Sequence, residues 1–268
     1  MKNEFIQYLR TNKGYSEHTA RAYSQDITDF VQWSLKNRVA ARWSTTEKAD
    51  IDNYVQDMQE RGLAATTIGR RVSSLRSFFQ WAVNSGKLAT NPAKYVASPK
   101  REETLPEVVE TEKIHRALES TRIRLVTKLE IAIMAETGIR LQECLDLRTQ
   151  DIDTAQHSMT IRGKGNKQRT VFYGKATEKY LEEFIPKGYR GILFVQTQRE
   201  VRWEIYQAMG THPHALRHTF ASAMLNNGAS LSAIQWQLGH KTVQTTERYA
   251  KLGTPAVRQQ YVSYAPSF

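Results

Sequence analysis

The stretch LATNPAKYVASPKREETLPEVV, residues 88–109, separates two regions of regular apolar periodicity. It holds three prolines and mixed charges but little periodicity of its own. Because proline removes a backbone donor and disfavours helical geometry in the residue before it, such a stretch is typical of a linker. A chain of 268 residues is long enough for two cores. The sequence therefore predicts a first domain over residues 1–98, a linker over 99–106 and a second domain over 107–268.

Helical periodicity fills the first domain from Glu4 to about Val83. Ser16 and Thr45 have the side chains of helix N-caps, and Gly62 is typical of a helix C-terminus. The helix that begins at Ser16 is expected to turn several side chains inward by its spacing. They are Ala20, Tyr23, Ile27, Phe30, Val31 and Leu35.

The third predicted helix, ATTIGRRVSSLRSFFQWAVNSG, carries basic residues on the side away from its apolar face. These are Arg70, Arg71 and Arg76. Such a face is suited to the phosphates of nucleic acid, and an ordinary solvated surface is the alternative interpretation.

The second domain is predicted to be mostly helical with one small sheet. The segments TEKIHRALEST and LVTKLEIAIMAETG have helical spacing, as do PHALRHTFASAMLNNG and SLSAIQWQLG, which Gly228 and Gly239 close. In contrast, SMTIRGKGNKQRTVFYG alternates like two strands around Gly163, Gly165 and Asn166. The expected fold class is mainly α, with a helical N-terminal domain and a second helical domain that contains a small antiparallel β-sheet.

The charge balance favours a polyanionic partner. Lysine and arginine outnumber aspartate and glutamate by 38 to 27, which gives a net charge of +11 and a pI near 9.7. Nucleic acid is the first candidate, although secreted and ribosomal proteins share this balance. The single cysteine, Cys144, excludes an internal disulfide, and its leucine neighbours predict a buried thiol. Because the N-terminus lacks the apolar region of a signal peptide and no apolar run approaches transmembrane length, we expect a cytoplasmic protein without membrane contact.

The segment HPHALRH predicts an anion site at a helix N-terminus. Pro213 suits the first helical position, which places His214 and Arg217 one turn apart on the same face. Unpaired backbone N–H groups there attract phosphate, and a surface helix with incidental charges is the alternative. His212, His214 and His218 also have the spacing of metal ligands. The permanent charge of Arg217 and the absence of a nearby cysteine or carboxylate argue against metal, so no metal or cofactor is expected.

Two further basic residues precede this helix in the sequence. Arg140 follows the helix stop at Gly138, and Glu143, one turn on, is placed to orient its guanidinium. A structural salt bridge is the alternative interpretation. Lys164 lies at the tip of the predicted hairpin, where flanking glycines allow a tight turn. The hairpin is not a phosphate-binding P-loop, because no strand leads through the required motif into a helix.

The segment LGHKTVQTTERYAKL places His240 after the helix that Gly239 closes, and Tyr249 on a short helix capped by Thr245 or Thr246. A phenol of pKa about 10 is a poor nucleophile until cations and a base stabilise its phenolate. Arginine forks suit nonbridging phosphate oxygens and keep their charge. Any single tyrosine is more often a structural aromatic than a nucleophile. Tyr249 is distinguished only by the arginines, histidines and lysine of the predicted site.

The ordered motifs TGIR, RGKGNKQR, HALRHTFA and LGHKTVQTTERY closely resemble those of the tyrosine recombinase, or phage integrase, family of lambda-integrase and Xer-type site-specific recombinases. The resemblance spans about Glu110 to Leu252, and the N-terminal helices resemble the family's SAM-like core-binding domain. The segment from Tyr173 to His212 is shorter than usual for the family. Since an arm-binding domain is not expected, the chain is similar to the compact two-domain members.

The resemblance implies a chemical role for each motif residue. Tyr249 would attack a DNA phosphodiester to leave a 3′-phosphotyrosine and a free 5′-hydroxyl, without a cofactor. The roles implied for the others are transition-state stabilisation by Arg140 and Arg217, phosphate contact by His240, proton transfer by His214, protonation of the 5′-oxygen by Lys164, and support of the first arginine by Glu143. Duplex contacts are expected from Arg70, Arg71, Arg76, Arg162 and Lys167.

The resemblance also implies an assembly on DNA. Four copies would join two double-stranded sites, exchange strands through a Holliday junction and work with accessory proteins. Val257, Tyr261, Val262 and Tyr264 would pack on a neighbouring copy, or form a free terminus. Two rival functions remain: relaxation of DNA by a type IB topoisomerase, and DNA binding by a regulator without catalysis. Integration, excision, inversion and chromosome dimer resolution all remain open.

Overall fold

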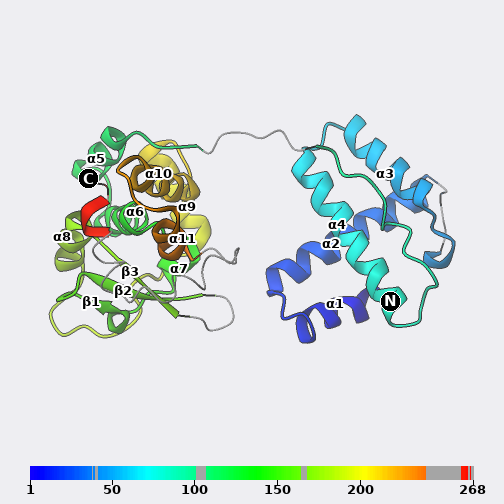
Figure 1. Cartoon of the computed structure of the whole chain (residues 1–268), viewed down its shortest axis with the longest axis horizontal. Coiled ribbons are helices and arrows are strands. Elements are labelled where there is room, and N and C mark those ends of the chain that lie inside the picture. The colour runs from blue at the N-terminus through cyan, green and yellow to red at the C-terminus, as the bar shows by residue number, and fades with distance from the viewer. Residues whose placement is uncertain are drawn as a thin grey trace. The chain divides into compact units, whose positions relative to one another are not determined.

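The structure is a computed structural model that describes residues 1–37, 39, 42–100, 107–163, 168–239, 261–264 and 266. The chain divides into two compact units, Met1–Thr104 and Leu105–Phe268 (Figure 1). Most of the linker predicted over residues 99–106 lies outside the described residues. The prediction of a mainly α chain with one small antiparallel sheet is confirmed.

Unit 1 is a helical domain whose core is rich in aromatic rings. Its elements are α1 (Lys2–Thr11), α2 (Glu17–Lys36), the 3-10 turn η1 (Trp43–Thr45), α3 (Lys48–Glu60) and α4 (Ala65–Asn84). Helix α4 packs against the other three α-helices (Figure 1). Its Phe78 ring lies 5.4 Å from the Phe5 ring and 4.6 Å from the Trp43 ring, centroid to centroid. These contacts join the first helix, the 3-10 turn and the last helix into one core.

The helix ends of unit 1 follow the sequence prediction in part. Ser16 caps α2, where its hydroxyl accepts a hydrogen bond from the Thr19 N–H at 3.3 Å. The prediction that Thr45 caps α3 is wrong, because the N-cap is Glu47, whose N–H donates to the Asp50 carboxylate at 2.8 Å. The prediction that Leu35 faces inward is also wrong. Leu35 is 64% exposed in the last turn of α2.

Unit 2 surrounds the buried helix α6 (Leu125–Thr137), in which every residue from Leu129 to Thr137 is buried. Helices α5, α8, α9 and α10 all pack against α6 (Figure 1). The remaining elements are α5 (Thr111–Glu119), α7 (Leu141–Leu145), η2 (Thr149–Asp151), β1 (Ile152–Asp153), β2 (Ser158–Arg162), β3 (Gln168–Phe172), α8 (Lys175–Phe184), α9 (Gln198–Met209), α10 (Pro213–Asn226) and α11 (Leu231–Leu238).

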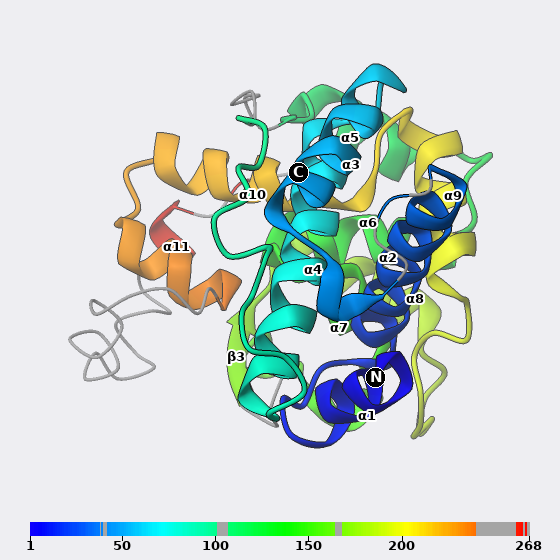
Figure 2. The same cartoon turned by 90° about the vertical axis from the view of Figure 1, so that its right-hand side faces the viewer.

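The sheet of unit 2 has the order β1-β2-β3, with antiparallel pairing throughout the described strands. The two strands of the predicted hairpin are confirmed, and their register pairs Ile161 with Arg169. Strand β1 was not predicted, since two residues are too short to show alternation. Helix α11 packs on β3 and on α10, and α10 and α11 lie side by side in Figure 2.

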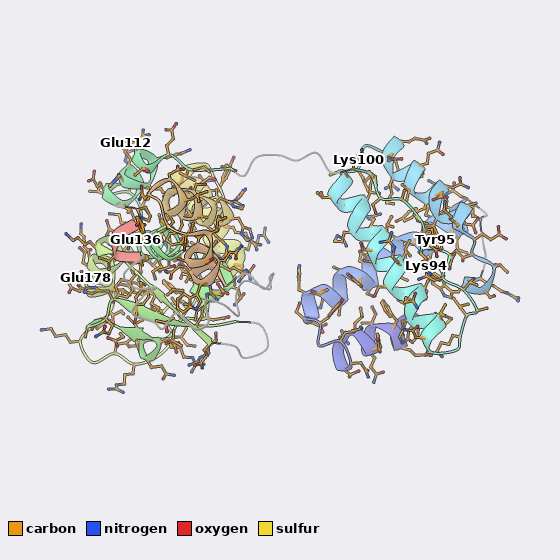
Figure 3. All side chains as sticks on the ribbon, in the orientation of Figure 1. Lys94, Tyr95, Lys100, Glu112, Glu136 and Glu178 are labelled. Atoms are coloured by element: carbon orange, nitrogen blue, oxygen red, sulfur yellow. The ribbon has the colours of Figure 1, made fainter. Side chains whose placement is uncertain are left out.

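Glu136, on the buried helix α6, caps a different helix. Its carboxylate accepts hydrogen bonds from the N–H groups of Gly174 at 3.0 Å, Ala176 at 3.2 Å and Thr177 at 2.9 Å. These are orphan donors at the start of α8, where a negative charge is favourable. A β-carbon at Gly174 would lie 2.6 Å from a Glu136 oxygen, so any larger residue there would have to displace this carboxylate. Glu136, labelled in Figure 3, thus fastens α8 to α6.

The helical residues Tyr261 to Tyr264, near the C-terminus, contact earlier parts of unit 2. The Tyr261 hydroxyl donates to the carbonyl of Glu136 at 3.1 Å, and the Asn227 side-chain amide donates to the carbonyl of Tyr264 at 3.0 Å. Tyr261 is buried and joins a small apolar cluster with Phe172 and Phe220. Tyr261 and Tyr264 therefore contact their own chain, whereas Val262 is 73% exposed. Val257, also expected to pack on a neighbour, lies outside the described residues.

Glu130 makes the stability of the chain depend on pH. It is fully buried in α6, and neither carboxylate oxygen has a hydrogen-bond partner among the described residues. Burial, and then the charge of Glu204, raise the pKa of Glu130 to about 8. Between the ordinary pKa of an exposed carboxyl and this value, the folded state holds a proton that the unfolded state has lost. Stability should therefore fall as pH rises through this interval, by about 1.4 kcal/mol per pH unit at most.

Glu130→Met is expected to remove this part of the pH dependence. The variant places an apolar side chain of similar length in an apolar site, and it carries no proton to lose. Urea unfolding from pH 5 to 9 should show that the free energy of unfolding falls less steeply with pH than in the wild type. The gain in stability should be largest at the alkaline end. Glu119→Met, at an exposed position of α5, should keep the wild-type slope. An equal slope in Glu130→Met would refute the prediction.

Candidate functional site

Arg140 and Glu143 form a fixed pair at the start of α7. Gly138 ends α6 in the left-handed region, at a φ of 65°, and turns the chain into Arg140, the N-cap of α7. The Arg140 N–H donates to Glu143 Oε2 at 2.8 Å, and its Nη1 donates to Oε1 at 3.0 Å. The Arg140 side chain is 43% exposed, while that of Glu143 is 9% exposed. The expected contact is present, and among the described residues it uses only one guanidinium N–H donor of Arg140.

Arg169, on β3, joins the same carboxylate and was missed by sequence reasoning. Its Nη1 and Nη2 donate to Glu143 Oε1 at 3.0 Å and Oε2 at 2.8 Å, a bidentate pair. Burial would raise the pKa of Glu143, but hydrogen bonds and charges from Arg169 and Arg140 outweigh it and lower that pKa. Arg169 is the last residue of the motif RGKGNKQR. The one sequence signal for its role is that a charged residue occupies a strand position expected to face inward.

Arg217 is buried between the C-terminal ends of two helices. Its Nη1 donates to the carbonyl of Gly138 at 2.5 Å, and its Nη2 donates to the carbonyl of Leu238 at 2.8 Å. These carbonyls carry the negative ends of the α6 and α11 dipoles, which stabilise a cation. Burial, and then repulsion from Arg140, lower the pKa of Arg217 to about 10. The guanidinium therefore remains charged at neutral pH.

Three arginines and one carboxylate meet here among the described residues: Arg140, Arg169, Arg217 and Glu143. Glu143 balances one of the three positive charges. A surplus of partly buried positive charge with open N–H donors attracts an anion, and a phosphodiester with two nonbridging oxygens fits the arginine fork. The arrangement can therefore stabilise negative charge that develops on phosphorus-bound oxygens.

His214 lies one helical turn from Arg217, at the start of α10. It is exposed, whereas Arg217 is 6% exposed. Partial burial, and then the charges of Arg217, His212 and His218, lower the pKa of His214. A neutral imidazole is able to accept a proton at neutral pH.

The three histidines of this segment do not gather as a metal site. His212 caps α10 by accepting the Ala215 N–H at 3.3 Å, and its other ring nitrogen lies 3.3 Å from Glu107. In the described parts of the chain, no group of three or more His, Cys, Asp or Glu side chains is arranged to hold a metal ion.

None of the described helices is long and apolar enough to span a membrane.

Four predicted site residues lie outside the described residues: Lys164, Lys167, His240 and Tyr249. Helix α11 does end at Gly239 in the left-handed region, at a φ of 66°, as predicted. A β-carbon on Gly239 would lie 2.9 Å from the Arg169 guanidinium. Gly239, the residue that ends α11, therefore lies against the Arg169 side chain.

The predicted DNA-contact arginines have partners within their own units. Arg71 donates to the Tyr54 hydroxyl at 2.9 Å and pairs with Asp29 at 2.7 Å. Arg76 donates to the carbonyls of Ala93 and Val96 at 3.3 and 3.0 Å. These contacts favour a structural role for Arg71 and Arg76.

The other two arginines are more open. Arg70 pairs with the buried Asp26 and stays 45% exposed. Arg162 pairs with Asp151 at 2.8 Å and stays 46% exposed. Arg70 and Arg162 therefore retain more surface for a ligand than Arg71, whose side chain is 16% exposed.

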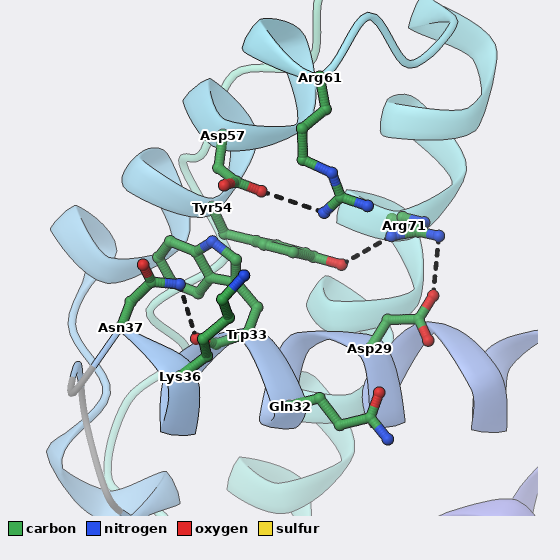
Figure 4. A pocket seen from close by; sticks show the side chains of 9 residues that line it. All are labelled: Asp29, Gln32, Trp33, Lys36, Asn37, Tyr54, Asp57, Arg61 and Arg71. Atoms are coloured by element: carbon green, nitrogen blue, oxygen red, sulfur yellow. Dashed lines mark hydrogen bonds and ion pairs between the residues drawn. The ribbon is translucent and has the colours of Figure 1, made fainter.

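A pocket of about 480 Å³ lies within unit 1. Its lining is Asp29, Gln32, Trp33, Lys36, Asn37, Tyr54, Asp57, Arg61 and Arg71 (Figure 4). Asp57 pairs with Arg61 at 3.2 Å, and Asp29 pairs with Arg71 at 2.7 Å. The acids and bases largely satisfy each other, so this pocket lacks the charge surplus of the arginine cluster.

Gly138→Ala is expected to destabilise unit 2 by about 2 to 4 kcal/mol, from overpacking and an unfavourable left-handed φ. A β-carbon there would lie 2.5 Å from Phe220 Cδ1 and 2.6 Å from Leu238 Cδ2. Gly188→Ala is the matched control, since Gly188 has a φ of 81° but nothing within 4 Å of the added carbon. Urea unfolding should separate the two variants. Equal losses of unfolding free energy in the two variants would show that the side chains around Gly138 move aside at little cost.

Both parts of the chain match models of one protein family. Residues 107–254 match the phage integrase family, and residues 3–86 match the phage integrase N-terminal SAM-like domain. Tyrosine recombinase XerC of Staphylococcus haemolyticus is 30% identical, over 98% of this chain and 95% of its own. Tyrosine recombinase XerD of Oceanobacillus iheyensis is 28% identical, over 98% of this chain and 97% of its own.

Solved structures share the fold. The XerH site-specific recombinase bound to its difH substrate, in a pre-cleavage complex, has a TM-score of 0.67 at 19% identity, over 96% of this chain and 84% of its own. A transposon integrase in complex with circular intermediate DNA has a TM-score of 0.65 at 19% identity, over 92% of this chain and 94% of its own. With both family matches in place, the chain belongs to the phage integrase family of tyrosine recombinases, whose members cleave and rejoin DNA through a tyrosine nucleophile.

Proposed function

We propose that the arginine cluster holds the scissile phosphate of a specific duplex DNA site and that Tyr249 attacks it. The gathering of three arginines around one carboxylate carries this proposal: Arg140 and Arg169 bind Glu143, and the buried Arg217 lies near enough to feel the charges of all three. Arg140, with its open guanidinium, and Arg217, fixed by two carbonyls, bind the nonbridging oxygens. Their charge is worth most in the transition state, where the phosphorus is pentacoordinate and carries the most negative charge.

The proposed reaction is a transesterification. The Tyr249 oxygen bonds to phosphorus, the bond from phosphorus to the 5′-oxygen breaks, and a 3′-phosphotyrosine and a 5′-hydroxyl result. His214, held neutral by its surroundings, accepts the phenolic proton, and Lys164 gives a proton to the 5′-oxygen. His240 contacts the phosphate. Because one phosphodiester bond is exchanged for another, the 5′-hydroxyl of a partner strand can reverse the step without an energy source.

The proposed assembly is a homotetramer on two DNA sites that exchanges strands through a Holliday junction. Two structural neighbours, the XerH recombinase and the transposon integrase, were solved with DNA, and both share the fold of this chain. The proposal includes accessory proteins that act at the same DNA sites. The reaction would serve integration, excision, inversion or dimer resolution.

The function is tested with nicked duplexes drawn from the host locus beside the gene. A nick next to the cleavage position lets the short strand diffuse away and traps the covalent complex on a denaturing gel. We expect a covalent adduct at one position, and recombinant products when two sites are supplied. Relaxation of supercoiled plasmid of any sequence would instead support a topoisomerase. Tight binding without an adduct would support a regulator.

A further inference from the structure

Arg169 directs its hydrogen-bond donors at groups of the protein itself. Both Nη atoms bind Glu143, and Nε donates to the carbonyl of Gln237 at 3.1 Å. The side chain is 13% exposed, against 43% for Arg140. A substrate phosphate would find open donors on Arg140, whereas the fork of Arg169 already holds a carboxylate in the bidentate geometry that it would offer to phosphate.

The Glu143 carboxylate is fully occupied by this arrangement. Oε1 accepts from Arg140 Nη1 and Arg169 Nη1, and Oε2 accepts from the Arg140 N–H and Arg169 Nη2. A carboxylate offers about four acceptor positions, and here each is filled. Glu143 therefore has one orientation, and it holds both the backbone and the guanidinium of Arg140 in place.

Arg169 also ties the end of α11 to α7. Its Nε bond to Gln237 lies in the last turn of α11, and Gly239 passes close over its guanidinium. Arg217 binds the neighbouring carbonyl of Leu238. The two arginines thus clamp the C-terminal end of the helix from which the chain continues to His240 and Tyr249.

We propose that Arg169 is a positioning residue of the cleavage reaction, which orients Arg140 through Glu143 and fixes the exit of α11. The inference rests on the proposed function. Without Arg169, Glu143 gains free acceptor positions and a larger uncompensated charge, and it draws the Arg140 guanidinium away from the phosphate. The loss should appear in the rate of cleavage and not in the affinity for DNA, because Arg169 faces the protein.

The test is single-turnover cleavage of the nicked duplexes by Arg169→Gln and Arg169→Lys, with DNA affinity measured on the same substrates. We expect Arg169→Gln to cleave about 10- to 100-fold more slowly, the usual cost of losing a residue that orients a binding group. Its DNA affinity should match the wild type. Arg169→Lys keeps the charge but lacks the fork, so its rate should lie between the two.

A double-mutant cycle with Glu143→Gln separates positioning from general structure. If Arg169 acts through Glu143, the double variant should cleave no more slowly than the slower single variant. Arg124→Gln is the matched control, since Arg124 pairs with Glu204 beyond the opposite end of α6, and it should cleave at the wild-type rate. Additive losses, or a loss of affinity equal to the loss of rate, would overturn the inference.

The remaining outcomes are also distinct. Wild-type rates in a folded Arg169→Gln variant would overturn the positioning role and leave the proposed function intact. If neither Arg169 variant folds, by thermal unfolding, Arg169 is a residue of the fold and the inference falls. If the wild-type protein itself gives no covalent adduct, the proposed function fails, and the inference fails with it.

Discussion

Tyr249→Phe is expected to abolish the covalent protein–DNA adduct while leaving duplex binding at the wild-type level. The substitution removes only the phenolic oxygen, which is the atom that would bond to phosphorus. The arginine cluster that would bind the phosphate is unchanged, because Arg140, Glu143, Arg169 and Arg217 are held by contacts to α6, α7, β3 and α11. Binding and chemistry should therefore separate completely in this variant.

The measurement is a denaturing gel of the nicked duplexes, together with a native binding assay. Tyr206→Phe is the matched control, since Tyr206 is 59% exposed on α9, and it should form the adduct as the wild type does. An adduct that persists in Tyr249→Phe would assign the nucleophile to another residue. Loss of both adduct and binding would mean that Tyr249 is a structural aromatic, the alternative that its sequence context left open.

Local features of the fold could be predicted from the sequence. Ser16 caps α2 and Gly138 and Gly239 end α6 and α11, because each of these choices depends on the residue's own backbone and hydrogen bonds. Thr45 was wrong by two positions, since Glu47 offers an equally local cap to the same helix. Sequence spacing alone does not decide which of two nearby candidate residues is the N-cap of a helix.

Features that depend on distant residues could not be predicted. The start of α8 is capped by Glu136, 38 positions away from Gly174, and no local pattern near α8 marks that partner. Arg169 reaches Glu143 across 26 positions, and alternation along a strand indicates a face without naming what lies on it. The motifs predicted Arg140, Glu143 and Arg217 as site residues, but the contact of Arg169 with Glu143 became visible only in the folded unit.

Arg217→Gln is expected to slow cleavage by about 10³-fold or more, whereas Arg217→Lys should slow it by about 10²-fold, the range known for losing one transition-state donor. Glutamine removes a full charge from a site that is 6% exposed, where low polarity strengthens its effect. Lysine keeps the charge, but a single ammonium is unable to span the carbonyls of Gly138 and Leu238 and a phosphate together.

The two Arg217 variants distinguish charge from geometry. Single-turnover cleavage at saturating protein measures the chemical step, and thermal unfolding checks that the assay temperature lies well below the transition of each variant. Arg124→Lys and Arg124→Gln, at the other end of α6, change the same groups away from the cluster and should retain the wild-type rate. Wild-type cleavage by Arg217→Lys would show that a buried positive charge suffices. Equal losses in both variants would show instead that the fork between the ends of α6 and α11 carries the whole effect.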